Sequence, residues 1–250
     1  KVAESGRTQR PAEPPIAGSN PALGFLSYGC SGVETLVRTW VDAYGDTTGC
    51  MDANERREAW DEIAETYATR RDPGGSDAAL IGEFLDECPP DPLVLDVGCG
   101  DGARTLANLP PGSVGLDVSR RGLDLASGTV PEARLVHGEM SALPLSGDSF
   151  DAITAYHAVF HVERDRHPAV YAEFARVLRP GGRLLTTLPS GRFETVRRGW
   201  MGGRMFFSAP GRDRTLAQLR EAGFTDVETA TATDPLGSST EFVFATLGGR

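Results

Sequence analysis

Residues 94–102 read VLDVGCGDG, a short apolar run that closes on alternating glycines. An apolar run that ends in glycines is typical of a buried parallel strand followed by a tight turn. Gly98 and Gly100 lack side chains, so the backbone there can approach a ligand closely. Because open α/β sheets bind ligands at the carboxyl ends of their strands, this turn predicts a binding site.

An acidic residue ends the next expected strand, SVGLDV at 113–118. Asp117 stands 21 residues beyond Asp96, which places a carboxylate beside the glycine turn. A carboxylate in that position suits the two hydroxyls of a ribose. The pattern G-x-G-x-x-A at 98–103 also satisfies the permissive dinucleotide fingerprint, so a nicotinamide-dependent enzyme and a turn without a ligand remain open alternatives.

Strands and helices alternate along the rest of the chain. Apolar runs predict strands, and amphipathic runs that stop at glycine or proline predict helices. The interval 190–211 reads as irregular. The pattern predicts an α/β doubly wound, Rossmann-like fold whose seven-stranded sheet ends in an antiparallel strand pair. The expected strands are 93–97, 113–118, 134–137, 150–156, 182–189 and two after residue 223, and the expected helices are 79–87, a segment from about Ala103, 119–127, 167–178 and 212–222.

Charge and hydropathy limit the class of protein. The chain has 250 residues, with 25 basic and 35 acidic side chains and a formal net charge of −10. An acidic chain is poorly suited to the phosphate backbone, so no nucleic-acid partner is expected. No uncharged apolar run reaches the roughly 18 residues of a membrane-spanning helix, so no membrane partner is expected either. The oligomeric state is left open.

The cysteines and the basic residues bear on location. No C-x-x-C pair occurs, and no signal-peptide pattern is seen at the start, so we expect reduced thiols in a cytoplasmic protein. Lys1 is the only lysine, and the other basic residues are arginines. Together with the acidic excess, this bias indicates a halophilic, salt-rich cytoplasm, although a GC-rich genome alone also produces arginine in place of lysine. The four cysteines are Cys30, Cys50, Cys88 and Cys99.

The first fifty residues differ from the rest. Residues 1–24 are rich in proline, glycine and serine and predict a disordered extension, whereas 33–44 predict a short amphipathic helix. A polar, strongly helical run begins at Met51. Two interpretations remain open: a flexible tail, or an upstream extension before a true start at Met51. We therefore expect an extension over 1–50 and one domain over 51–250.

Several further segments resemble one family in the expected order. VLDVGCGDG at 94–102 and GLDVS at 115–119 are similar to the first motif and the ribose-binding strand end of the class I S-adenosylmethionine-dependent methyltransferases. The closest resemblance is to the small-molecule group that includes the quinone-biosynthesis C-methyltransferases. The other matching segments are WDEIAETYATR at 60–70, HGEMSALPLSGDSFDAI at 137–153, AVFHV at 158–162, LRPGGRLL at 178–185 and EAGFTDVE at 221–228.

The resemblance implies S-adenosylmethionine as cofactor and assigns residues to it. Asp96 would orient the loop, Asp117 would take the ribose hydroxyls, and Met140 would pack on the adenine. Glu139 stands where the family usually has aspartate. An aromatic ring favours a cation, which suits Tyr67 for the sulfonium side. The full cofactor set is Tyr67, Asp96, Gly98, Cys99, Gly100, Asp117, Val118, Glu139, Met140 and Tyr156.

The expected reaction is in-line transfer of the methyl group to an unidentified small-molecule acceptor. A general base is optional, and the candidates are His157 and His161, expected on one helix face. No third ligand accompanies that pair, so no metal is expected. The segment 190–211 mixes arginines with aromatic rings, as in an acceptor pocket or a plain surface loop. The substrate-binding candidates are His161, Arg197, Trp200 and Phe206.

Two other functions stay open. An NAD(P)-dependent oxidoreductase commonly needs a catalytic acid such as a Tyr/Lys pair, and no lysine follows Lys1. A cofactor-binding protein without turnover keeps the same pocket and therefore the same sequence pattern.

Overall fold

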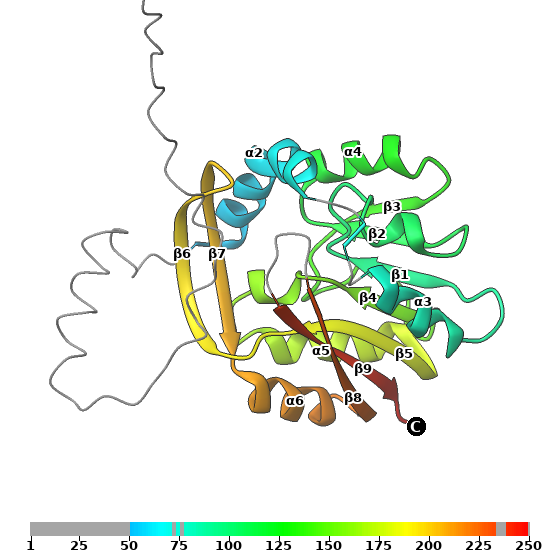
Figure 1. Cartoon of the computed structure of the whole chain (residues 1–250). Coiled ribbons are helices and arrows are strands. Elements are labelled where there is room, and N and C mark those ends of the chain that lie inside the picture. Colours follow the sequence, from blue (N-terminus) through cyan, green and yellow to red (C-terminus); the bar gives the residue numbers. More distant parts are fainter. Residues whose placement is uncertain (1–50, 72–73, 76–77, 234–238, 250) are drawn as a thin grey trace, which may run out of the picture.

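A computed structural model describes residues 51–71, 74–75, 78–233 and 239–249 of the chain. Its centre is a seven-stranded sheet of order β3-β2-β1-β4-β5-β9-β8 (Figure 1). The first five strands of this order are parallel, and β9 is antiparallel to both of its neighbours. The expected doubly wound sheet with an antiparallel terminal pair is therefore confirmed.

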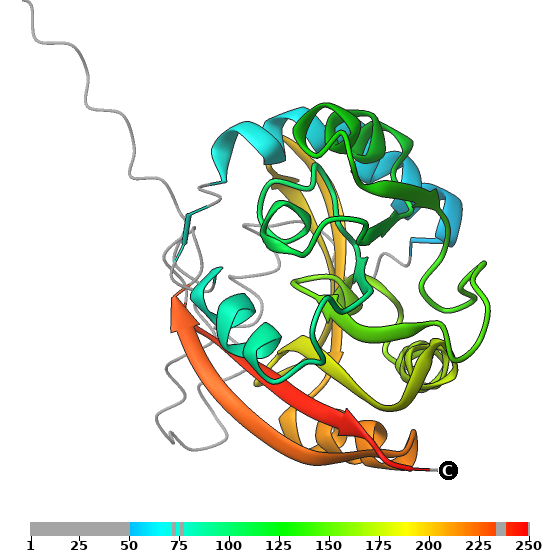
Figure 2. The same ribbon diagram turned by 90° about the vertical axis from the view of Figure 1, so that its right-hand side faces the viewer.

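The strands and helices keep the expected order in the chain. In Figure 2 the antiparallel β8–β9 pair forms one long, curved edge of the molecule. The sheet consists of β1 (Val94–Val97), β2 (Val114–Asp117), β3 (Arg134–His137), β4 (Phe150–Ala155), β5 (Leu178–Leu188), β8 (Phe224–Thr233) and β9 (Ser239–Leu247). The α-helices are α2 (Ala53–Arg70), α3 (Ala79–Asp86), α4 (Arg120–Thr129), α5 (His167–Val177) and α6 (Arg212–Glu221).

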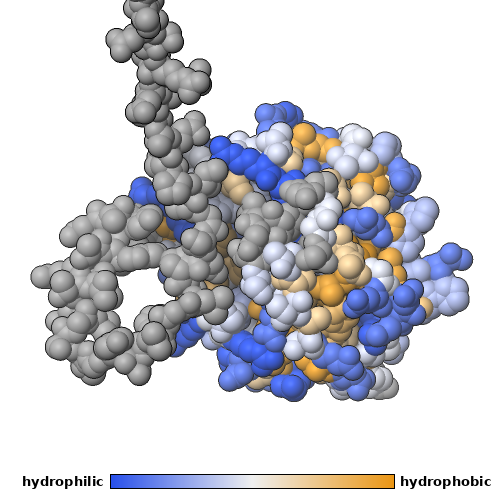
Figure 3. All heavy atoms as spheres, in the orientation of Figure 1, coloured by the Kyte–Doolittle hydropathy of each residue, from blue (hydrophilic) through white to orange (hydrophobic). Residues whose placement is uncertain are grey.

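Helices cover both faces of the sheet because successive residues of a strand point to opposite sides. Leu95 and Ile153 pack with α5 and α6 on one face. Val94 and Ala152, one position earlier in each strand, pack with α3 on the other face. Both faces are buried, which is why these parallel strands read as continuous apolar runs. On the surface seen in Figure 3, hydrophilic and apolar residues are interspersed.

Two helix starts carry clear sequence signals. Asp52 accepts a hydrogen bond from the Glu55 N–H, and the Glu55 side chain accepts one from the Asp52 N–H, which makes a capping box for α2. Ser119 caps α4 by accepting a hydrogen bond from the Gly122 N–H at 2.9 Å. α2 and α4 pack against each other (Figure 1).

The segment 190–211 is not irregular. It forms β6 (Arg192–Trp200) and β7 (Gly203–Pro210), an antiparallel hairpin that is a separate two-stranded sheet. The hairpin turn is Met201-Gly202, with φ of 51° and 89°. Turns with two positive φ values usually contain asparagine or aspartate, so the sequence gives little sign of this one. β7 is buried against α2 and η3 (Val159–His161), so tertiary packing stabilises the hairpin.

Two other local expectations were wrong. The segment after Ala103 forms turns and a short 3-10 helix, η2 (Leu106–Asn108), because the Pro110-Pro111 pair follows at once and disfavours a longer helix. His157 and His161 do not share a helix face: His157 has φ of 50°, and His161 ends the one-turn helix η3.

Some expectations lie outside the described residues. They are the disorder of 1–24, the helix over 33–44 and the choice between a tail and an upstream extension over 1–50. Among the helices that the structure does describe, none combines the length and the hydropathy needed to cross a bilayer.

Candidate functional site

A cleft opens at the carboxyl ends of β1, β2 and β4, where the expected binding site lies. It holds about 840 Å³ of atom-free space, part of which is open to solvent. Its walls come from the glycine turn, the start of α4, the segment after β4, and α2 on the side facing them. Ligand sites in open α/β sheets occur at this edge.

The glycine turn is held to β2 by its own backbone. The Leu116 carbonyl accepts hydrogen bonds from the N–H groups of Gly98 at 2.7 Å and Cys99 at 3.1 Å. Gly98 and Gly100 both have positive φ, 75° and 55°. A Cβ added at Gly98 would lie 2.6 Å from the Ala158 Cβ, whereas one at Gly100 would meet no atom within 4 Å. Gly98 is therefore required by packing, and Gly100 leaves open space beside the cleft.

Asp117 organises the turn from the end of β2. Its carboxylate accepts hydrogen bonds from the Gly100 N–H at 2.8 Å and from the Ser119 N–H at 2.8 Å. The side chain is buried, and burial raises the pKa of this carboxyl above its ordinary value while the backbone donors partly offset the rise. Each oxygen keeps acceptor capacity toward the cleft, which Asp117 lines.

Asp96 and Cys99 lie behind the turn and do not line the cleft. The Asp96 carboxylate accepts hydrogen bonds from the hydroxyls of Thr105 and, at 2.8 Å, Thr154. Burial raises the pKa of Asp96 to about 6. The Cys99 side chain packs with Leu106 in an apolar cluster, and burial raises the pKa of its thiol well above the ordinary value. Asp96 thus supports the loop, and Cys99 contributes packing.

The remaining cofactor candidates do line the cleft. They come from five separate parts of the chain: α2, the glycine turn after β1, the end of β2, the segment after β3 and the end of β4. The structure therefore brings together, around one space, residues that are up to 89 positions apart in the sequence. These residues are Tyr67, Gly98, Gly100, Asp117, Val118, Glu139, Met140 and Tyr156.

A group of aromatic rings, which we call the aromatic wall, stands on the α2 side of the cleft. Trp60 makes edge contacts with Tyr67 (centroids 5.4 Å apart), His161 (4.8 Å) and Trp200 (5.9 Å). Phe207 contacts His161 at 4.7 Å and Trp200 at 5.3 Å. The wall consists of Trp60, Tyr67, His161, Trp200 and Phe207, and it joins α2, η3 and the hairpin.

Of the four acceptor candidates, only His161 lines the cleft. His161 lines the cleft directly, and Trp200 belongs to the wall behind it. The Arg197 guanidinium lies 4.8 Å from the centroid of the Phe207 ring. Phe206 is buried on the other side, under the Arg56 guanidinium, and does not reach the cleft.

Both histidines near the cleft are neutral at pH 7. His161 Nδ1 lies 2.8 Å from the Phe206 carbonyl, and since a carbonyl only accepts, Nδ1 carries the proton and Nε2 the lone pair. Burial lowers the pKa of His161 to about 4, and the positive charge of Arg71 adds to the effect. Burial also holds the pKa of His157 well below its ordinary value. Within the described part of the chain, no cluster of three or more metal-ligating side chains occurs.

Sequence reasoning missed residues of α2 and of the start of α4. Trp60 and Arg56 line the cleft from α2, about a hundred positions before η3 in the sequence. Ser119 lines it as well, and its hydroxyl donates to the Asp61 carboxylate at 2.7 Å. The helical run at 60–70 was the available signal, but only the fold shows which of its faces meets the cleft.

The residues present fit an adenosine with a sulfonium-bearing tail. Asp117 is a buried carboxylate with spare acceptor capacity for hydroxyls, and Gly100 leaves the room that a side chain would take. Val118 and Met140 offer apolar contact for a flat ring, and Tyr67 brings an aromatic ring that already has the Arg71 guanidinium 4.7 Å from its centroid.

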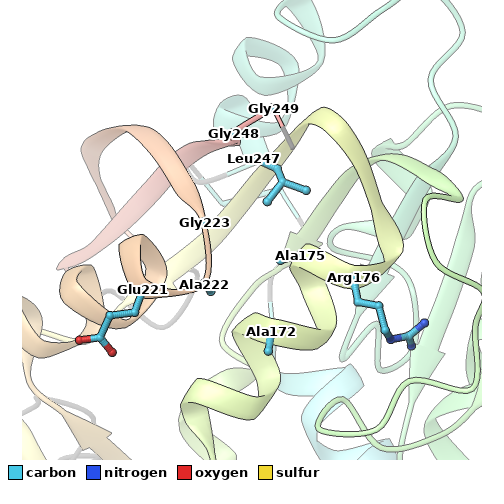
Figure 4. Close-up of a pocket in the computed structure, with 9 residues that line it drawn as sticks. All are labelled: Ala172, Ala175, Arg176, Glu221, Ala222, Gly223, Leu247, Gly248 and Gly249. Carbon is cyan, nitrogen blue, oxygen red and sulfur yellow. The ribbon is translucent and has the colours of Figure 1, made fainter.

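A second hollow lies at the far end of α5 and α6, against the end of β9 (Figure 4). About 800 Å³ of atom-free space lies in it, part of which is open solvent, but alanine and glycine make up most of its lining. Its two charged side chains are already engaged: Arg176 with Glu173 at 2.7 Å, and Glu221 with Arg214 at 2.7 Å. We therefore assign the ligand site to the cleft.

Comparison with known proteins agrees with this geometry. A methyltransferase-domain family model matches residues 94–182. The chain is 28% identical over 184 residues to the tRNA (carboxymethyluridine(34)-5-O)-methyltransferase of Xenopus tropicalis, across 73% of this chain and 24% of that protein. It is 31% identical over 171 residues to the malonyl-[acyl-carrier protein] O-methyltransferase of Hahella chejuensis, across 62% and 57%. The chain thus spans less than two thirds of either relative's length.

A solved structure supports the fold. The S-adenosylmethionine-dependent methyltransferase of Methanosarcina mazei is 18% identical, with a TM-score of 0.58, over 68% of this chain and 98% of that one. The strand order, the glycine turn facing Asp117 and the matched family model agree with one another. Residues 94–182 thus match a methyltransferase domain, within a sheet whose strand order is typical of the class I S-adenosylmethionine-dependent methyltransferases.

Proposed function

We propose that the protein transfers a methyl group from S-adenosylmethionine to a small molecule held in the cleft. The observation that carries the proposal is the arrangement of Asp117 and Gly100 on one side of the cleft and the aromatic wall on the other. One side is polar and open enough for a nucleoside. The other is apolar and large enough to shield a reacting centre from water.

The reaction needs alignment more than acid–base help. Bound S-adenosylmethionine supplies a methyl carbon on a positive sulfur: a lone pair of the acceptor forms the new bond to carbon while the carbon–sulfur pair stays on sulfur, which becomes a neutral thioether. Any proton of the acceptor atom passes to solvent. The chain's task is to hold the two partners in line, which accelerates such reactions strongly.

We assign the donor side to the residues around the glycine turn. Asp117 accepts the ribose hydroxyls, and Gly100 gives them room. Val118 and Met140 pack on the adenine, and Glu139 lies at its rim. Asp96 acts indirectly, because its bonds to Thr105 and Thr154 hold the strand and the turn together.

We assign the acceptor side to the aromatic wall and His161. The Tyr67 and Trp60 rings favour positive charge on sulfur by their quadrupoles. His161 Nε2 carries a lone pair and accepts a hydrogen bond from an acceptor hydroxyl, which fixes the direction of the nucleophile. Its low pKa supports a positioning role and not that of a general base at neutral pH.

The relatives support an oxygen acceptor. Their names give O-methylation of a carboxymethyluridine in tRNA and of a malonyl group on a carrier protein. Both groups contain a carboxylate oxygen. For this chain we infer a small molecule and no tRNA, because the formal net charge is −10 and nucleic-acid binding favours a basic face.

A titration followed by a transfer assay tests the proposed function. We expect S-adenosylhomocysteine to bind and NAD not to bind, as measured by calorimetry. A labelled-methyl assay with a metabolite extract then yields a labelled small molecule. NAD binding in place of S-adenosylhomocysteine would favour an oxidoreductase, and donor binding without any labelled product would favour a binding protein without turnover.

Three further proposals concern the location, the habitat and the domain organisation of the protein. A cytoplasmic location is supported by the unbridged thiols of Cys88 and Cys99. A salt-rich habitat is supported by the acidic excess and the single lysine. The division into an extension over 1–50 and a domain over 51–250 is supported by the Asp52 capping box, which starts α2 immediately after Met51. Mass spectrometry of the natural protein tests the last of these.

A further inference from the structure

Arg56 is a buried arginine that lines the cleft and uses only part of its hydrogen-bonding capacity. Its side chain, near the start of α2, is 7% exposed. Both of its hydrogen bonds leave from Nη1, one to the Met51 carbonyl at 2.7 Å and one to the Glu163 carboxylate at 2.5 Å. Toward the residues that the structure describes, the N–H groups of Nε and Nη2 make no hydrogen bond.

The unused N–H groups of Arg56 are not sealed inside the protein. Among the described residues, none of the fully buried nitrogen atoms that lack a partner belongs to Arg56, so Nε and Nη2 still reach open space. The Phe206 ring covers the guanidinium on one side, with its centroid 5.8 Å from Cζ, and the open space that Arg56 borders is the cleft. Since a buried donor is costly to leave unpaired, these N–H groups favour a ligand that offers them an oxygen.

His161 lies next to Arg56 in the wall of the cleft. Arg56 and Trp60 are four positions apart on α2, so they share a helix face, and the Trp60 ring meets the His161 ring with centroids 4.8 Å apart. Glu163, which bonds to Arg56, stands two residues after His161. The Phe206 carbonyl accepts the His161 Nδ1 proton. The wall therefore presents a donor, Arg56, beside an acceptor, His161 Nε2.

The charges around this donor–acceptor pair are balanced. The carboxylate of Glu163 neutralises Arg56. His161 is uncharged at pH 7, because burial lowers its pKa to about 4. Asp101 and Glu139 line the same cleft and are acidic. An anionic ligand would find no uncompensated cation in Arg56, so the pair suits an uncharged oxygen better than a carboxylate.

We propose that the methyl acceptor is a neutral compound in which a hydroxyl group lies beside a carbonyl group, and that Arg56 selects it by donating to the carbonyl oxygen. The proposal rests on the function proposed above and names the class of its acceptor. The hydroxyl donates to His161 Nε2, and its oxygen forms the bond to the methyl carbon while the carbon–sulfur pair stays on sulfur. The hydroxyl proton passes to solvent. Arg56 is thus a specificity residue.

Three probes of matched shape test the proposal. The full chain, loaded with S-adenosylhomocysteine, is titrated by ligand-detected NMR with 2′-hydroxyacetophenone, with 2-ethylphenol, which lacks the carbonyl oxygen, and with salicylate, which has a carboxylate instead. A hydrogen bond from a charged donor is stronger than one between neutral groups, so 2′-hydroxyacetophenone should bind roughly tenfold more tightly than 2-ethylphenol. It should also bind more tightly than salicylate.

Two variants separate the donor from the ion pair. Arg56→Met combined with Glu163→Met removes both charges together, and apolar side chains of similar volume commonly replace a buried ion pair without loss of stability. The ratio of the 2′-hydroxyacetophenone and 2-ethylphenol affinities should then fall to about one. Glu163→Gln keeps the donor but uncovers its charge, so salicylate should bind at least as tightly as 2′-hydroxyacetophenone. Loss of packing alone would not produce that reversal.

Arg204→Met is the matched control. It breaks another bond to α2, the one from Arg204 on β7 to Glu55 at 3.0 Å, and neither residue lines the cleft. It should keep the wild-type ratios. Each variant should bind S-adenosylhomocysteine as the wild type does, which shows that it is folded. Should the double variant lose this binding, the salicylate preference of Glu163→Gln decides alone.

The remaining outcomes distinguish this proposal from its foundation. Equal affinity of the wild type for 2′-hydroxyacetophenone and 2-ethylphenol, or no binding of the former at millimolar concentration, would overturn the acceptor class. An unchanged ratio in the folded double variant would remove Arg56 from acceptor selection. Failure of the wild type to bind S-adenosylhomocysteine would instead remove the proposed function itself.

Discussion

The Asp61 carboxylate on α2 accepts a hydrogen bond from the Ser119 hydroxyl at 2.7 Å, across 58 positions of sequence. The same oxygen accepts the Arg121 N–H at 3.1 Å. Ser119 also caps α4 and follows Asp117 closely in the chain. One carboxylate thus ties the helix that carries Trp60 and Tyr67 to the strand end on the donor side.

Asp61→Ala should weaken donor binding. The variant removes a tie between α2 and α4, so the rings on α2 are held less firmly over the cleft. Losing one such hydrogen bond costs about 1 kcal/mol, which predicts a roughly fivefold lower affinity for S-adenosylhomocysteine. Calorimetry measures it. Glu62→Ala, at the next and exposed position, is the control, and equal affinities in the two variants would contradict the prediction.

Asp117→Asn should weaken donor binding further. The amide keeps the shape of the side chain but loses the charge that strengthens its bonds to the Gly100 and Ser119 N–H groups. Hydrogen bonds to charged groups are worth about 1.5–3 kcal/mol, so affinity for S-adenosylhomocysteine should fall by roughly ten- to a hundredfold. Asp124→Asn, exposed on α4, should bind as the wild type does. Unchanged affinity in the Asp117 variant would remove this residue from the ribose site.

Substitution of Gly98 and substitution of Gly100 should have different effects. Gly98→Ala should lower the free energy of unfolding by about 1–3 kcal/mol, because its Cβ would collide with Ala158 and its φ is positive. Gly100→Ala meets no protein atom within 4 Å, so it should lose donor affinity with a smaller loss of stability. Gly128→Ala, within α4, is the control. Chemical denaturation and calorimetry together measure both effects, and the opposite pattern would reverse the two roles.

Asp96 should make stability depend on pH. Its pKa is raised to about 6 in the folded chain from an ordinary value of 3.8, so its stabilising contribution is complete below about 3.8 and is lost as pH rises through 6. Relative to Asp96→Asn, the wild type should lose about 1.4 kcal/mol of unfolding free energy between pH 5 and pH 7.5. Urea denaturation at the two pH values measures it. A parallel response of both proteins would show that Asp96 does not titrate there.

The sequence allowed the sheet, and the meeting of the glycine turn with Asp117, to be predicted, because their signals are local. The apolar run before Gly98 and the aspartate after β2 are each read within a few residues, and parallel order then brings strand ends together. Asp96 and Cys99 belong to the same motif but lie behind the turn. A motif fixes the position of a residue in the chain and leaves the direction of its side chain to packing.

The acceptor side was harder to predict because its contacts are long-range. Trp60 meets His161 across a hundred positions, and no local pattern marks that contact. The hairpin escaped prediction because its strand β6 is rich in arginine and its turn begins with Met201, where asparagine is usual. Its apolar residues are buried by α2, which lies more than 130 positions earlier in the chain.

The β6–β7 hairpin shares no strand pairing with the seven-stranded sheet. Its strands pair only with each other, and the hairpin contacts the rest of the protein through side chains of α2 and η3. Substitutions at the exposed positions of β6 should therefore leave the strands of the main sheet undisturbed, whereas the buried residues of β7 hold α2 in place. Under the proposed function, β6 is consequently the part of the hairpin in which acceptor preference can be altered while the methyl-donor pocket is kept.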